Sequence, residues 1–127
     1  MEKVAFISGA NRGIGFETSK KLAQLGIKVI LGSRDLKKGK EAVEELASIG
    51  IEADLVQYDA FDSEAPQKVH DYIAEKYNKL DILINNAGVL LTGNLFVTNS
   101  STVSDKDVKD TFQTNLFSVI SLTQKLL

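Results

Sequence analysis

The sequence predicts an α/β fold in which helices cover both faces of a parallel, doubly wound sheet. Four short apolar segments alternate along its 127 residues with longer segments whose apolar residues recur at helical spacing. Strands joined by such helical connections are parallel, and the connections are right-handed. With 43% hydrophobic and 25% charged residues, the composition is typical of a globular chain. The length corresponds to about one small domain.

The first strand and the first helix lie on either side of a glycine-rich turn. Residues 4–7 form an apolar run of the kind that is buried on both faces of a sheet. A helix is predicted over residues 13–25, with Gly26 placed to form a left-handed C-cap. Residues 28–31 give the second strand. The apolar stripe of this helix consists of Ile14, Thr18, Leu22 and Leu25.

A second helix is predicted from Asp35 to about residue 48. Aspartate is a favourable N-cap, because its carboxylate accepts hydrogen bonds from the free N–H groups of the first turn. Helical spacing places Val43, Leu46 and Ala47 toward the core.

The third and fourth strands are expected over residues 54–57 and 81–85, separated by a helix over residues 63–77. Pro66 is tolerated in that helix because it lies in the first turn. The stretch 89–104 has no clear period and is long for a connector, so we expect a functional loop. Its apolar residues would either wall a substrate cleft or belong to an uncovered core.

A last helix is predicted from Ser104 onward, and its apolar stripe reaches the end of the sequence without a glycine or proline stop. We therefore expect a fold that is truncated after the fourth strand and its following helix. The fourth strand would then have an open apolar edge, and self-association would use this edge or the last helix. The stripe consists of Val108, Phe112, Leu116, Val119, Ile120 and Leu127.

Charge and residue usage exclude several classes of function. Fifteen basic and 17 acidic residues give a net charge of −2, which is unsuited to a nucleic-acid or anionic membrane surface. The absence of cysteine excludes disulfides, thiol catalysis and thiolate metal sites, and His70 has no partners at metal-ligand spacing. No apolar run reaches the roughly 18 residues of a membrane span, and no signal peptide is evident, so we expect a cytoplasmic protein.

The turn Ser8-Gly9-Ala10-Asn11-Arg12-Gly13-Ile14-Gly15 carries the clearest functional signal. Between a strand and a helix, a dinucleotide diphosphate would meet free backbone N–H groups and the positive end of a helix dipole. Glycine is needed there because a β-carbon would obstruct both the tight turn and the approach of the phosphate. The spacing is Gly-x-x-x-Gly-x-Gly, and an ordinary glycine-rich turn is the alternative.

Together with further segments, this turn resembles the short-chain dehydrogenase/reductase family, in its carbonyl-reductase-like branch. The resemblance covers essentially the whole chain. It implies the Rossmann-type, cofactor-binding half of an oxidoreductase that reduces an aldehyde or ketone to an alcohol with a nicotinamide cofactor. The further segments are Ser33-Arg34-Asp35, Asp59, Asn85-Asn86-Ala87-Gly88 and Thr114-Asn115.

The resemblance also implies which residues contact the cofactor. Asp59 would contact the adenine, assisted by the backbone of Ala60, although a loop cap explains Asp59 equally well. Asn86, Ala87 and Gly88 would line the ribose and nicotinamide side, whereas Asn85 is expected to stabilise the central sheet. The full set is Gly9, Asn11, Arg12, Gly13, Ile14, Gly15, Ser33, Arg34, Asp59, Ala60, Asn86, Ala87 and Gly88.

Charge at the end of the second strand favours NADP over NAD. An acidic residue there would accept hydrogen bonds from a ribose 2′-hydroxyl, whereas an arginine would pair with a 2′-phosphate. Asp35 fits the count, but Ser33 and Arg34 come first after the strand and Asp35 is better placed as a helix cap. Arg12 adds a second cation on the same side. Residues 1–127 are thus assigned to one NADP-binding domain, incomplete at its carboxyl end; two surface arginines are the alternative.

Of the family's reactive centre, only the asparagine is matched, by Asn115; a helix-interior amide is the alternative. Tyr72 and Lys76 satisfy Tyr-x-x-x-Lys, but the family's pair follows a fifth strand. A rise of about 1.5 Å per residue also carries Tyr72 about 13 Å from the catalytic edge. We assign this pair to packing or to the surface. Without a matching serine, tyrosine or lysine, the chain alone is expected to be inactive or very weak, and a non-catalytic NADP-binding or interaction module is the alternative function.

Overall fold

A computed structural model describes residues 2–86 and 118–126 of the chain. The predicted loop at 89–104 and the predicted helix start at Ser104 lie outside the described residues, as do Ala87, Gly88 and Asn115. The elements in chain order are β1 (Val4–Ser8), α1 (Gly13–Gln24), β2 (Lys28–Ser33), α2 (Leu36–Ala47), β3 (Asp54–Gln57), α3 (Ala65–Lys76), β4 (Ile82–Ile84) and α5 (Ser118–Leu126).

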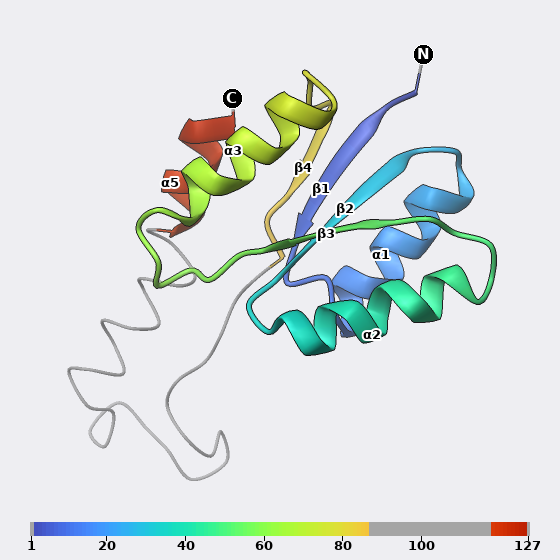
Figure 1. Ribbon diagram of the computed structural model, residues 1–127. Helices are drawn as coiled ribbons and strands as arrows, with labels where there is room; N and C mark the ends of the chain where they lie inside the picture. Colours follow the sequence, from blue (N-terminus) through green and yellow to red (C-terminus); the bar gives the residue numbers. More distant parts are fainter. Residues whose placement is uncertain (1, 87–117, 127) are drawn as a thin grey trace, which may run out of the picture.

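The four strands form one parallel sheet in the order β3-β2-β1-β4. The chain moves outward from β1 to β2 and β3, and then crosses to the other side of β1 to form β4. Helices α1 and α2 cover one face of the sheet, and α3 and α5 cover the other (Figure 1). This is the predicted doubly wound α/β arrangement, in which the carboxyl ends of all four strands meet at one edge.

Two hydrophobic clusters fill the space between the sheet and its helices, and β1 contributes to both. Ala5 and Ile7 pack with α1 and α2, whereas Val4 and Phe6 pack with α3 and α5. This alternation follows from the two-residue period of a strand. Because both faces are covered, every residue of β1 is buried, as predicted for a continuous apolar run.

Strand limits differ from prediction where the sequence is not apolar. β2 continues beyond Leu31 through Gly32 and Ser33, which pair with the end of β3. A β-carbon on Gly32 would lie 2.6 Å from Cζ of Phe6, so close packing against that ring requires glycine. β3 has the predicted limits, and β4 is shorter than predicted at both ends.

The buried face of α1 also differs from prediction. The helix packs on the sheet through Gly15, Phe16 and Ser19, and the Ser19 hydroxyl donates to the carbonyl of Gly15 at 2.8 Å. Ile14 and Leu25, at the ends of the predicted stripe, are 79% and 77% exposed. Leu22, within the stripe, packs against the core as predicted, so the apolar spacing was wrong at the two ends of the stripe and did not identify the small residues that bring the helix close to the sheet.

Burial in α2 and α5 corrects two further predictions. In α2 the buried residues are Gly39, Ala42 and Leu46, while Ala47 is exposed. Among the described side chains of α5, Leu122 is buried and Leu126 packs against the same cluster, whereas Ile120 is 45% exposed. Two residues correspond to about 200° around a helix, so Ile120 must point away from α3 when Leu122 packs against it.

Candidate nucleotide-binding site

The candidate site lies at the edge where the strands end. The glycine turn follows β1, Arg34 follows β2, Asp59 follows β3 and Asn86 follows β4. With the strand order β3-β2-β1-β4, these segments form a row along one edge of the sheet. The point between β1 and β4, where the chain changes direction across the sheet, is where ligands of open α/β sheets bind.

Glycine is required at the three motif positions for two different structural reasons. Gly9 and Gly13 have φ values of +62° and +60°, which side chains rarely adopt, and they shape the turn. Gly15 has no such φ, but a β-carbon there would lie 2.5 Å from both the carbonyl oxygen of Gly9 and Nδ2 of Asn86. A β-carbon on Gly13 would meet nothing within 4 Å, so the outer side of the turn is open.

Asn86 connects the end of β4 to this turn. Its backbone N–H donates to Oγ of Ser8 at 3.0 Å, and its Nδ2 donates to the carbonyl of Gly9 at 3.0 Å. Asn85, expected to stabilise the central sheet, instead donates from Nδ2 to Oγ1 of Thr123 on α5 at 3.2 Å. The cofactor contact that the resemblance implies for Asn86 stays a prediction.

The N-terminus of α1 can receive an anion. Its N-cap is Arg12, in extended conformation, and no side chain in the described part of the chain caps the first turn. The first N–H groups of a helix lack partners within the helix, and they point toward the turn together with the positive end of its dipole. α2 differs, because Oδ1 of Asp35 accepts from the backbone N–H groups of Lys37 at 2.9 Å and Lys38 at 3.2 Å, as predicted for a cap.

Arg12 and Arg34 meet in one polar pocket of about 380 Å³. Both arginines are exposed, and the carboxylate of Asp35 at the same pocket already caps α2. Sequence reasoning missed Lys38, which lies in the first turn of α2. A cation three residues after an N-cap at this edge is the signal that could have identified it. The lining residues are Asn11, Arg12, Arg34, Asp35 and Lys38.

Ser33 does not line this pocket. Its side chain is buried, and its hydroxyl donates to the carbonyl of Asp35 at 2.8 Å. Asp59 accepts on Oδ1 from the backbone N–H of Phe61 at 2.9 Å, which is the loop-cap alternative. The adenine contact that the resemblance implies for Asp59 and Ala60 stays a prediction.

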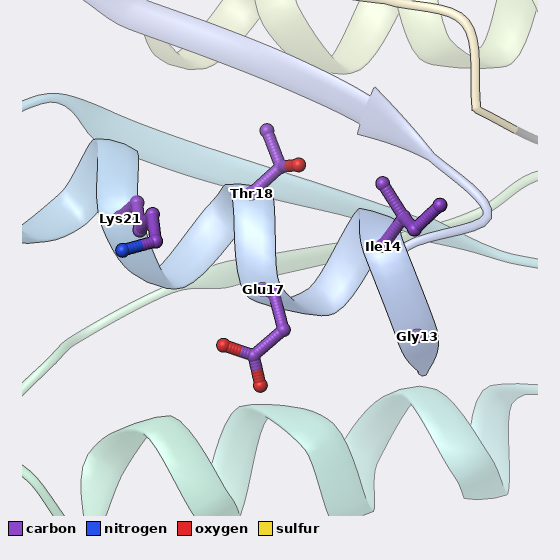
Figure 2. Close-up of a pocket in the computed structure, with 5 residues that line it drawn as sticks. All are labelled: Gly13, Ile14, Glu17, Thr18 and Lys21. Atoms are coloured by element: carbon purple, nitrogen blue, oxygen red, sulfur yellow. The ribbon is translucent and has the colours of Figure 1, made fainter.

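A second hollow, of about 440 Å³, lies along the flank of α1 and begins at the glycine turn. Figure 2 shows that Ile14 and Thr18 point to the same side of the helix, whereas Glu17 points toward α2. The lining is largely apolar, so this hollow differs from the cation pocket. Exposed Ile14 is therefore available to an apolar part of a ligand that reaches past the turn. The lining residues are Gly13, Ile14, Glu17, Thr18 and Lys21.

Tyr72 and Lys76 lie at the opposite edge, where β3 begins. The Tyr72 hydroxyl and Lys76 Nζ both bind Oδ2 of Asp54, at 2.9 Å each, and Tyr77 donates to the same oxygen. Lys28 Nζ lies 3.4 Å from Oδ1. Tyr72 and Lys76 thus have a structural role at the amino edge of the sheet, in agreement with their assignment to packing.

The pKa shifts of Asp54 and Tyr72 fit a structural role for this cluster and do not fit a catalytic one. Burial acts to raise the pKa of Asp54, but hydrogen bonds from Tyr77, Lys76 and Tyr72 outweigh it and hold the pKa below its usual value. Burial and the Asp54 carboxylate raise the pKa of Tyr72. A tyrosine that must release a proton near neutral pH needs the opposite shift.

The described residues contain no group of three histidine, aspartate or glutamate side chains that could hold a metal ion. Among the described helices, none combines the length and the apolar character that a membrane span requires.

Comparison with known proteins identifies the family of this chain. The model of the short chain dehydrogenase family matches residues 3–127. Carbonyl reductase (NADPH) 1 of Mus musculus is 31% identical over 125 residues, which make up 98% of this chain and 43% of the mouse protein. Short-chain dehydrogenase/reductase 1 of Saponaria officinalis is 43% identical over 91 residues, or 69% of this chain and 30% of that protein. The chain spans less than half the length of these curated relatives.

Solved structures show the same fold. A variant of actinorhodin polyketide ketoreductase with NADPH superposes with a TM-score of 0.90 at 28% identity, over 99% of this chain and 46% of that one. A metagenomic short-chain oxidoreductase in complex with NADP gives a TM-score of 0.86 at 29% identity, over 98% of this chain and 54% of that one. Strand order, glycine turn and family match agree, and the chain belongs to the short-chain dehydrogenase family.

Proposed function

We propose that residues 1–127 form the NADP-binding part of an oxidoreductase that reduces an aldehyde or ketone to an alcohol. The observation that carries this proposal is the cation pocket, in which Arg12, Arg34 and Lys38 surround an opening beside the glycine turn. A ribose 2′-phosphate is a dianion that such a group would recognise, and each charge-assisted contact contributes about 1.5–3 kcal/mol. Both solved structures described above contain this nucleotide, as NADPH or NADP.

Asp35 is the residue that would argue for NAD, and its hydrogen bonds weaken that argument. An acidic side chain selects NAD by accepting from the ribose 2′-hydroxyl. Oδ1 of Asp35 already accepts from two backbone N–H groups of α2. The three cations of the pocket then outnumber one carboxylate that is held at a helix terminus.

The described residues would bind and orient the nucleotide. The diphosphate would lie on the open side of Gly13 at the start of α1, and Asp59 would contact the adenine. NADPH, when bound, supplies the hydride. Small carbonyl or alcohol compounds are the proposed substrates, and the roles of Ala87, Gly88 and Asn115 remain predictions outside the described residues.

A second function, a non-catalytic NADP-binding module, is favoured by one observation. The Tyr-x-x-x-Lys pair in the described part of the chain lies at the amino edge of the sheet and binds Asp54. Consumption of NADPH by the full-length protein, across a panel of aldehydes and ketones, distinguishes the two functions. Turnover supports the oxidoreductase, whereas tight binding without turnover supports the module.

Nucleotide selectivity tests the common part of both functions. We expect NADPH to raise the melting temperature of the chain more than NADH at equal concentration, because a ligand at 100 times its Kd stabilises by about 2.7 kcal/mol. Arg34→Ala should reduce the NADPH effect and leave that of NADH unchanged. Lys40→Ala is the control, since Lys40 is exposed on α2 but does not line the pocket. Equal stabilisation by both nucleotides would contradict the proposal.

Self-association at the edge of β4 remains a proposal as well. Among the described strands, β4 pairs with β1 alone. Through its other edge, this apolar three-residue strand would pair with a second copy and extend the sheet. Sedimentation of the chain at several concentrations tests this, and Leu83→Lys should shift any dimer toward monomer.

A further inference from the structure

We infer that Gln57 and Ser33 act as positioning residues, which hold the backbone of Arg34 in place and thereby set the preference for a 2′-phosphorylated nucleotide. The inference rests on the proposed function, which it extends to residues that do not line the cation pocket. Neither side chain needs to touch the nucleotide for this role.

Three consecutive carbonyl groups around Arg34 each accept a hydrogen bond. The carbonyl of Ser33 accepts from the backbone N–H of Tyr58 at 3.0 Å. The carbonyl of Arg34 accepts from Nε2 of Gln57 at 3.2 Å. The carbonyl of Asp35 accepts from the Ser33 hydroxyl at 2.8 Å and from the backbone N–H of Gly39 at 2.9 Å. The peptide groups that precede and follow Arg34 are thus tied to β2, β3 and α2.

The hydrogen bond from Gln57 is the one in this network that involves a strand side chain in place of backbone pairing. The ladder between β2 and β3 ends at the pair Ser33 and Gln57. Arg34 is the next residue, so the ladder no longer fixes its backbone. The side chain of Gln57, at the exposed end of β3, provides the bond that another strand residue would otherwise provide.

Backbone position matters here because an arginine recognises phosphate through a planar fork of N–H groups. Arg34 is exposed, and its long side chain loses rotamer freedom when it pairs with a ligand. A fixed backbone narrows the directions that the guanidinium samples, so less freedom is lost on binding. Loss of the Gln57 hydrogen bond should therefore weaken the binding of NADPH, which has the 2′-phosphate, more than the binding of NADH, which lacks it.

The test compares Kd values of NADPH and NADH for the whole chain by isothermal titration calorimetry. Gln57→Leu keeps the size of the side chain and removes its donor. We expect the ratio of the NADH Kd to the NADPH Kd to fall by up to about fivefold, since the energy of one net hydrogen bond is the upper limit of its effect on binding. Gln67→Leu is the matched control, because Nε2 of Gln67 makes an exposed hydrogen bond of 2.7 Å to Asp71 on α3. Its ratio should stay at the value of the unchanged chain.

A double-mutant cycle shows whether Gln57 acts through Arg34. In an Arg34→Ala background, Gln57→Leu should leave the ratio unchanged. Without any other substitution, Ser33→Ala should lower the ratio. Ser33→Thr, which retains the hydroxyl, should leave the ratio at the value of the parent chain.

The outcomes separate this inference from the proposed function. A Gln57→Leu chain with a lower melting temperature but an unchanged ratio has lost only a structural bond, which refutes the inference. An effect that persists with Arg34→Ala refutes it as well. A chain that binds NADPH and NADH equally, or binds neither, overturns the proposed function, and the inference with it.

Discussion

Replacing Gly15 with alanine should destabilise the chain by about 2 kcal/mol, although alanine in a helix is normally favoured over glycine by about 1 kcal/mol. The new β-carbon would lie 2.5 Å from both the Gly9 carbonyl oxygen and Nδ2 of Asn86. Overpacking of this kind costs about 1–3 kcal/mol. If Asn86 moves away, its hydrogen bond to Gly9 is lost, at a further cost of about 1 kcal/mol. These two costs exceed the gain in helix propensity.

Urea unfolding followed by circular dichroism measures this effect, and a second substitution identifies its cause. Asn86→Ala removes one of the two close contacts, so Gly15→Ala should cost less in that background, with a coupling of about 1 kcal/mol. Gly13→Ala is the comparison, because it places a residue at a φ of +60° but meets nothing within 4 Å. Its cost, about 1–2 kcal/mol, should add to that of Asn86→Ala. A Gly15→Ala chain that is more stable than the parent, or one whose cost adds to that of Asn86→Ala, would refute the reasoning.

Three further predictions concern the two charge clusters. Asp54→Asn should lower the free energy of unfolding by about 2 kcal/mol, because Lys28 and Lys76 then lose their anionic partner; a urea midpoint close to that of the parent would contradict this. Since the folded-state pKa of Asp54 is lowered, its contribution is complete above the unfolded value near 3.8 and is lost as the pH falls through the folded value. Urea midpoints between pH 2 and 7 should therefore fall more steeply for the parent than for Asp54→Asn. Lys38→Ala should raise the Kd of NADPH about tenfold and leave the Kd of NADH unchanged, with Lys40→Ala as the control in the same titration.

Most of the fold could be predicted because strand runs and caps are local signals. β3 has the predicted limits, and Asp35 caps α2 as expected. The end of β2 was missed because Gly32 and Ser33 have low strand propensity, and the close packing of Gly32 against the ring of Phe6 involves a residue of the neighbouring strand. A contact between residues so far apart in sequence leaves no trace in the local pattern.

The site was predicted in part, for similar reasons. Arg12 and Arg34 were expected on the same side, and the structure places both on one pocket. Lys38 was not anticipated, because helical periodicity distinguishes buried faces from exposed ones but does not show which exposed face borders a neighbouring turn. The burial of Ser33 was not predicted, because its direction depends on where β2 ends, and a change of one residue reverses the direction of a side chain.

The pair Tyr72 and Lys76 shows why topology must accompany a sequence motif. Their spacing satisfies a catalytic pattern, yet Asp54, which binds both, is the first residue of β3. In a parallel sheet all first residues lie at one edge, and four residues of strand separate that edge from the other by about 13 Å. Burial, together with the Asp54 carboxylate, raises the pKa of Tyr72, which makes the hydroxyl a poorer proton donor. This pair therefore holds α3 to the start of β3, away from the edge at which Gly9, Arg34 and Asn86 lie and at which we propose that the nucleotide binds.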